Sequence, residues 1–289
     1  MSPHGTFSLG ISTFGGFCVC GRHAHGSHPN YPFPKFIPVL VMVPRDILVH
    51  QGIEPQPGPV GGTACAPFSK VNPGVLEVIN ITNMDTRSSA LINREAHALA
   101  IGEHSIPSHR VGAIKSRFSE AGWRGHLSPL DPELSHNTGG VAGMARNPSR
   151  FFVMKSFTNR FQQLLLGGRV ALFGLEIGLP IPILVVVFYG WTNGRHNVEA
   201  AKRTDDLLQA VADELEAQPG SLFVVVGDLN ADPEQLPHVS ALLQSNAWFD
   251  VGARGALFGG QELEPTCQGY NSTLPTRNDY VFACPNIVP

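Results

Sequence analysis

The sequence has no surplus of basic residues. Lysine and arginine together number 20 against 23 aspartate and glutamate, and the formal net charge is −3 at pH 7. Proteins that hold DNA by neutralising many phosphates usually carry a basic surplus, so the total charge argues against tight non-specific DNA binding. The total charge does not exclude a local basic face. It does not exclude a divalent-metal site either, because such a site must itself be acidic.

Long hydrophobic runs are also missing. The most apolar stretches, residues 37–43 and 183–189, fall far short of the ~20 residues that a membrane-spanning helix needs. The first residues lack the charged start and apolar stretch of a secretory signal. We therefore expect no membrane segment and an intracellular protein.

Cysteine is scarce and odd in number. The five cysteines are Cys18, Cys20, Cys65, Cys267 and Cys284. An odd, scattered set does not form a disulfide framework, which favours a reducing compartment. Two of them share residues 18–28 with three histidines, but the spacing matches no common structural zinc site. A compositionally biased flexible tail is the favoured interpretation, with zinc as the alternative.

Proline crowds the first 75 residues, and residues 1–70 are predicted to be a poorly ordered leader. Within it, residues 52–59 (Gly-Ile-Glu-Pro-Gln-Pro-Gly-Pro) resemble ribosome-skipping peptides that end in Asn-Pro-Gly-Pro. Gly52 stands where such peptides have Asp, and Gln56 where they have the Asn. A proline-rich turn segment is the alternative interpretation.

From residue 71 onward the pattern changes to that of one folded domain, residues 71–289. Apolar runs predict strands at residues 75–81, 98–102, 140–146, 151–157, 169–177, 183–189, 222–226 and 280–283. Helical periodicity predicts helices at residues 110–121, 198–218 and 232–243. Asn197 and Asp232 are the expected caps of the last two helices. This mixture predicts an α+β architecture built on mixed sheets.

The sharpest chemical signal is Gly227-Asp228-Leu229-Asn230, directly after the predicted buried strand 222–226. Side chains at i and i+2 of an extended chain point the same way, so a carboxylate and an amide converge on one spot. The alternative is that they only satisfy turn and helix-start amides. Because Asp232 already serves as the cap, Asp228 and Asn230 remain available for chemistry.

This tetrapeptide resembles the Gly-Asp-Phe/Leu-Asn motif of the endonuclease/exonuclease/phosphatase superfamily, and the sequence looks most similar to the endonuclease domains of non-LTR retrotransposons. Other family segments follow in order. Asn80, with Asn83 as a rival, matches the metal-binding Asn of the first strand, and Glu103 matches the metal-binding Glu, with Gly102 where the family has Gln. The remaining matches are Asn137 to Ala142, Tyr189, Thr266, and Thr276 to Phe282, in which Asn278 replaces Ile.

The resemblance implies a layered α/β sandwich of two mixed, mainly antiparallel sheets flanked by helices, and a monomeric phosphodiester hydrolase. Glu103 and Asn80 would hold Mg²⁺, or Mn²⁺ in its place. Asp228 would orient or deprotonate water, while Asn230 and Tyr189 would donate to the phosphoryl oxygens. Asp279 would orient a histidine from a later Ser-Asp-His motif. DNA is expected as the substrate more than RNA, and a retrotransposon endonuclease would be nuclear.

That histidine is missing, because none of the twelve histidines follows His238. We expect a domain truncated at its C-terminus that cleaves DNA poorly. A phosphatase or RNase of the same fold is one alternative, and a catalytically dead binding module is another. His104, His109 and His196 are expected to be surface residues.

Overall fold

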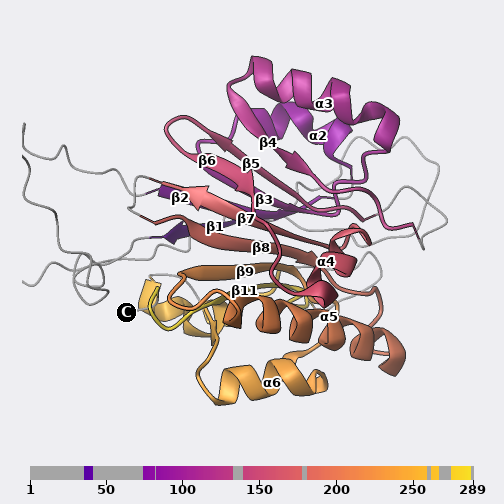
Figure 1. The fold of residues 1–289 in the computed structure, drawn as a ribbon, viewed down its shortest axis with the longest axis vertical. Helices are drawn as coiled ribbons and strands as arrows, with labels where there is room; N and C mark the ends of the chain where they lie inside the picture. The colour runs from indigo at the N-terminus through magenta and orange to yellow at the C-terminus, as the bar shows by residue number, and fades with distance from the viewer. Residues whose placement is uncertain are drawn as a thin grey trace, which may run out of the picture.

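The computed structural model describes residues 36–41, 74–81, 83–132, 139–177, 181–258, 262–266 and 275–287. In these residues two β-sheets lie face to face, and helices cover their outer faces (Figure 1). The predicted layered α+β sandwich of two mixed sheets is therefore confirmed.

The first sheet has five strands in the order β1-β2-β3-β5-β4. Its strands are β1 (Phe36–Val41), β2 (Gly74–Asn80), β3 (Ala98–Gly102), β4 (Trp123–Leu127) and β5 (Ala142–Arg146). The pair β2 and β3 is parallel, and all other neighbours in this sheet are antiparallel.

The second sheet has six strands in the order β10-β11-β9-β8-β7-β6. Its strands are β6 (Arg150–Val153), β7 (Val170–Glu176), β8 (Ile183–Tyr189), β9 (Phe223–Asp228), β10 (Phe249–Asp250) and β11 (Asp279–Ala283). Here β8 and β9 form the parallel pair, joined through a helical crossover, and the other pairings are antiparallel. Every residue of β8 is buried, as expected for a strand covered on both faces.

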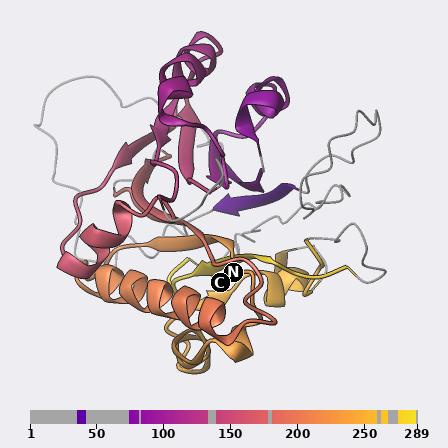
Figure 2. The same ribbon diagram turned by 90° about the vertical axis from the view of Figure 1, so that its right-hand side faces the viewer.

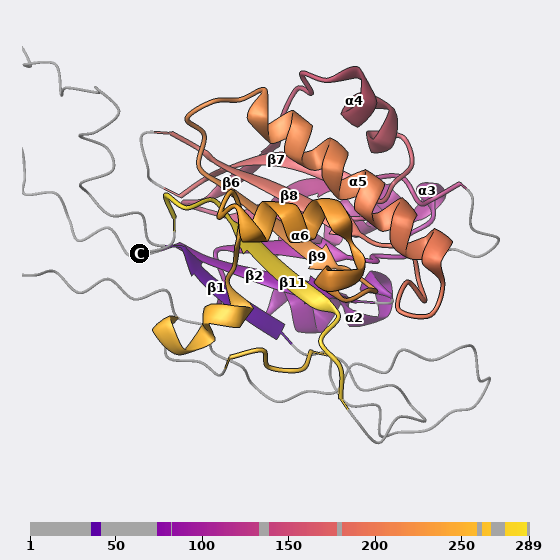
Figure 3. The ribbon, with the colours of Figure 1, turned by 90° about the horizontal axis from the view of Figure 1, so that it is seen from below.

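The helices form the two outer layers (Figures 1 and 2). They are α2 (Met84–Ile92), α3 (Ser108–Glu120), α4 (Asn159–Leu165), α5 (Val198–Glu216) and α6 (Pro237–Gln244). The first two cover the first sheet, and α5 and α6 cover the second, which Figure 3 shows from below. No helix in the described part of the chain is long and apolar enough to span a membrane.

Three apolar cores separate these four layers. Val78 of the first sheet and Val187 and Val226 of the second belong to the core between the sheets. A second core joins the other face of the second sheet to α5, and a third joins the first sheet to α2 and α3. At about 1.5–3 kcal/mol for each fully buried apolar side chain, these cores hold the two sheets in one fixed relation.

One described segment of the predicted leader, residues 36–41, joins the first sheet. β1 pairs antiparallel with β2, from Phe36 opposite Ile79 to Val41 opposite Gly74. The cluster at residues 18–28 and the segment 52–59 lie outside the described residues, and the domain boundary at residue 71 stays a prediction.

Several elements differ from the sequence-based prediction. The strand expected over residues 151–157 ends at Val153. The backbone N–H groups of Phe157 (2.7 Å) and Thr158 (2.8 Å) donate to the carboxylate of Glu214, so they are not available to continue the strand. The helix expected over residues 232–243 is a 3₁₀ turn, Pro233–Gln235, followed by α6. Leu236 between them is extended, as a residue before proline prefers to be.

Candidate active site

Four central strands end at one edge of the sandwich. In the parallel pair of the first sheet Asn80 is opposite Gly102, so Glu103 directly follows the end of β3. In the second sheet Asp228 is opposite both Tyr189 of β8 and Asp279 of β11. The two sheets therefore bring their polar strand ends to the same edge.

A hydrogen bond crosses from one sheet to the other at this edge. Nδ2 of Asn80 donates to Oδ2 of Asp228 at 2.8 Å. Tyr189 and Glu103 form the second cross-sheet pair, close enough for each to shift the pKa of the other. Each parallel strand pair thus contributes two polar groups to the edge.

The Gly-Asp-Leu-Asn turn has a tightly determined backbone. A Cβ on Gly227 would lie 1.9 Å from the carbonyl oxygen of Phe188, so no larger residue fits there. Asn230 adopts the left-handed region, with φ of 55°, which Asn tolerates better than most residues. Its backbone N–H donates to Oδ1 of Asp228 at 2.9 Å, and its Nδ2 donates to the carbonyl of Gly190 at 3.3 Å. Each oxygen of the Asp228 carboxylate therefore accepts a hydrogen bond from a fixed group.

Asp279 is held in place through its backbone. The hydroxyl oxygen of Thr266 accepts hydrogen bonds from the N–H groups of Asn278 (3.0 Å) and Asp279 (2.9 Å). The carbonyl of Asn278 accepts from Leu229 N–H at 2.7 Å, which ties this segment to the Gly-Asp-Leu-Asn turn. The polar Asn278, where the family has Ile, also receives a weak 3.4 Å bond from the hydroxyl of Thr276.

The electrostatics of the edge are those of a desolvated, negatively charged site. Burial raises the pKa of Glu103 to about 7, with a smaller contribution from the charge of Asp279, while Arg169 and Tyr189 oppose the shift. Burial, and then the charges of Glu103 and Asp228, raise the pKa of Tyr189 above its usual range. The Tyr189 hydroxyl therefore keeps its proton and remains a donor.

The donor set fits a hard divalent cation. Oδ1 of Asn80 is buried and has no hydrogen-bond partner, although buried acceptors normally have one. Gly102, next to Glu103, packs against this oxygen. Among the described residues no three His, Cys, Asp or Glu side chains gather as a metal site, so water would complete the coordination. Mg²⁺ is commonly held in this way, by one or two protein oxygens and several waters.

Sequence reasoning missed one buried charge beside the site. Arg169 is only 4% exposed, forms an ion pair with the equally buried Asp131, and donates to the carbonyl of Gly190 at 3.1 Å. Its guanidinium lies 5.4 Å from the ring centroid of Tyr189. In the sequence, the one sign of this buried charge was an arginine directly before the largely apolar strand β7.

The expected surface position of His104 is wrong. Its ring is fully buried, accepts from the backbone N–H of Ile106 at 3.0 Å and donates to the carbonyl of Ser128 at 3.0 Å. It lies against Gly140, which has φ of 75° and whose added Cβ would lie 2.4 Å from the ring. Burial lowers the pKa of His104 to about 4, so the ring is neutral. His109 and His196 are exposed, as predicted.

The rival metal ligand, Asn83, has another function. Its Oδ1 accepts from the backbone N–H groups of Asp85 (3.1 Å) and Thr86 (3.2 Å), which makes it the N-cap of α2. Residues 137 and 138 of the glycine-rich segment lie outside the described part of the chain.

Comparisons with known proteins agree with this architecture. Residues 50–289 match the Endonuclease/Exonuclease/phosphatase family. The fold is similar to a 3'-5' exonuclease from Neisseria meningitidis, with 14% identity, a TM-score of 0.53, and coverage of 73% of this chain and 86% of that chain. An AP endonuclease from Archaeoglobus fulgidus gives 16% identity, a TM-score of 0.54 and the same coverages.

A third solved structure, an AP endonuclease from Leishmania major, has 13% identity, a TM-score of 0.55, and coverage of 72% of this chain and 78% of that chain. No curated protein sequence matches this chain. At these identities the structural likeness establishes the fold alone.

Proposed function

This chain belongs to the Endonuclease/Exonuclease/phosphatase family, and on that premise we propose that it is a Mg²⁺-dependent phosphodiester hydrolase that nicks DNA. Members of this family are generally phosphodiesterases or nucleases that use divalent metal ions. The observation that carries the proposal is the cross-sheet bond from Asn80 to Asp228. It leaves Oδ1 of Asn80 buried and unpartnered near Gly102, the residue before Glu103.

In this proposal Glu103 and Oδ1 of Asn80 hold the cation. Mg²⁺, when bound, would stabilise negative charge on the phosphate and on the leaving oxygen. Glu103 is suited to this role, because a carboxylate buried without a cation is electrostatically unfavourable, as its raised pKa reflects.

Asp228 orients the attacking water and accepts its proton. Both of its oxygens accept hydrogen bonds from fixed groups, so its position is set before substrate binds. Tyr189 and Asn230 donate to the phosphoryl oxygens as charge develops. Asp279, opposite Asp228 in the sheet, is the remaining acid of the site and serves to orient a further donor.

DNA as the substrate, and a retrotransposon-like origin, are proposed from the sequence resemblance. A solved neighbour with 14% identity is described as a 3' phosphatase bound to a product DNA hairpin. Phosphatase and RNase activities therefore belong in the same test.

The test is a time course on supercoiled plasmid, single-stranded RNA and a 3'-phosphorylated oligonucleotide, each with Mg²⁺ or with EDTA. In line with the poor cleavage expected from the sequence, we expect slow plasmid nicking that requires Mg²⁺ and falls by a further factor of about 100 in Asp228→Asn. Asp232→Asn is the matched control, because Asp232 lies four residues away and pairs with Arg195. Cleavage of RNA or of the phosphomonoester alone would reassign the substrate. No metal-dependent hydrolysis of any of the three would overturn the proposal.

A further inference from the structure

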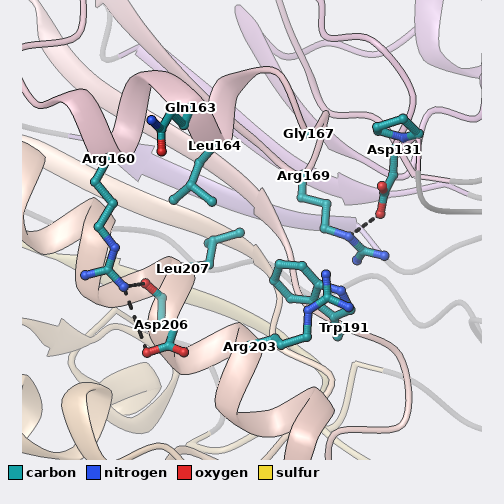
Figure 4. A pocket seen from close by; sticks show the side chains of 11 residues that line it. Asp131, Arg160, Gln163, Leu164, Gly167, Arg169, Trp191, Arg203, Asp206 and Leu207 are labelled. Carbon is teal, nitrogen blue, oxygen red and sulfur yellow. Dashed lines mark hydrogen bonds and ion pairs between the residues drawn. The ribbon is translucent and has the colours of Figure 1, made fainter.

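A second site lies next to the catalytic edge. A pocket of about 380 Å³ opens between the start of α4, the first half of α5 and the segment that follows β8. Arg160, Arg169 and Arg203 reach it from three different elements, with Trp191 beside two of them (Figure 4). Two carboxylates, Asp131 and Asp206, also line it, and Asp213 lies near Arg160.

Trp191 forms cation–π contacts with two of the arginines. The guanidinium carbons of Arg169 and Arg203 each lie 4.4 Å from the centroid of its ring. Such contacts restrain long arginine side chains and so reduce the entropy that an incoming ligand must remove. The indole is partly exposed, whereas the other two tryptophans, Trp123 and Trp248, are buried.

The positive charges of Arg169 and Arg160 are neutralised to different extents. Arg169 is buried against Asp131. Arg160 is fixed by a 2.9 Å bond to the carbonyl of Asp206, but its carboxylate contacts, with Asp206 at 3.9 Å and Asp213 at 3.7 Å, are long. Its side chain is 49% exposed, so water and salt screen these pairs strongly. An anion with several oxygens would compete well for such a guanidinium.

The pocket and the catalytic edge share their backbone. Trp191 is two residues after Tyr189, a reach of at most ~7 Å along the chain. Gly190, between them, accepts from Arg169 at 3.1 Å and donates its N–H to the carbonyl of Asp228 at 2.7 Å. The wall of the pocket at Trp191 is therefore tied through Gly190 to the backbone of Asp228.

We propose that this pocket binds a backbone phosphate of the nucleic-acid strand that flanks the scissile phosphodiester. Arg160 and Arg203 contact the phosphate, and Trp191 with Arg169 forms the rigid base beneath it. The inference rests on the proposed function, because a polymer with a phosphate at each nucleotide is the ligand that occupies both sites at once.

The experiment titrates the full chain with a short oligothymidine in EDTA, so that no cleavage occurs, and follows tryptophan fluorescence. We expect a saturable change that disappears in Trp191→Phe. Arg203→Gln and Arg160→Gln should each weaken binding about tenfold and lower the salt slope by about one. Arg150→Gln is the matched control, because Arg150 is 72% exposed, pairs with Glu176 and does not line the pocket.

The outcomes separate this inference from the proposed function. Saturable binding lost in the arginine variants, with no cleavage in Mg²⁺, supports the pocket and overturns the hydrolase. Metal-dependent nicking with an unchanged KM in the Arg160→Gln, Arg203→Gln double variant supports the hydrolase and overturns the pocket. A fluorescence change that persists in that double variant, or none at millimolar oligonucleotide, also overturns it.

Discussion

Asn80 and Asp228 are 148 positions apart in the sequence, and a 2.8 Å hydrogen bond joins their side chains across the two sheets. The bond fixes the amide so that its nitrogen faces Asp228, and the amide oxygen is left buried without a partner. In the proposed mechanism, Asn80 would thereby both orient the carboxylate that activates water and offer an oxygen to a cation.

Replacing Asn80 by Ala should weaken Mg²⁺ binding about tenfold or more, measured by isothermal titration calorimetry. The reason is the loss of one of the two protein oxygens in the proposed coordination. Asn83→Ala is the control for the rival ligand. It should lower stability by about 0.5–2 kcal/mol through loss of the α2 cap and leave Mg²⁺ affinity unchanged. The reverse pattern would make Asn83 the ligand.

Replacing Thr266 by Val should lower the free energy of unfolding by about 2–3 kcal/mol, measured by urea titration. The methyl group that replaces the hydroxyl leaves the N–H groups of Asn278 and Asp279 without their acceptor. Thr266→Ser retains the oxygen and should restore most of the loss. An unfolding midpoint in Thr266→Val equal to that of the wild type would show that these two bonds contribute little.

Acid should destabilise the fold through His104. Its folded pKa of about 4 lies below the unfolded value near 6.5, so the unfolded state binds more protons between these values. Stability from this group is therefore fully present above about pH 6.5 and is lost as the pH falls toward 4, up to roughly 3 kcal/mol.

Urea midpoints between pH 7.5 and 4.5 measure this effect. Glu103, with a folded pKa of about 7, acts in the opposite direction over the same range, so the readout is the difference between variant and wild type. Relative to the wild type, His104→Gln, whose amide can still donate and accept, should gain stability as the pH falls from 7.5 to 4.5. His109→Gln, at an exposed position, should follow the wild type. The same pH dependence in His104→Gln as in the wild type would assign the acid sensitivity to other groups.

Local patterns predicted much of the fold, and the apolar runs gave β3 and β8 with their observed bounds. The i, i+2 argument for Asp228 and Asn230 assumed an extended chain, but Asn230 has φ of 55° and its backbone N–H donates to Asp228. The roles of these two residues stay a prediction from the motif. α2 escaped prediction because its inward positions are Met84, Ser88 and Leu91, and the central serine interrupts the apolar stripe.

The burial of His104 was not predictable from its neighbours in sequence. It depends on a space opposite Gly140, which only the pairing of distant segments creates. Arg169 escaped notice for the same reason, since its partner Asp131 is 38 positions away. Periodicity within one strand or helix gives no information on contacts between distant segments, and both missed features depend on such contacts.

The proposed metal site can be tested by an anomalous-scattering map from crystals of this chain soaked in Mn²⁺. We expect one strong peak within coordination distance of Oδ1 of Asn80 and of the Glu103 carboxylate, and we expect it to be lost in Glu103→Gln crystals that retain the fold. A peak elsewhere, or none at this edge in the wild-type crystal, would contradict it.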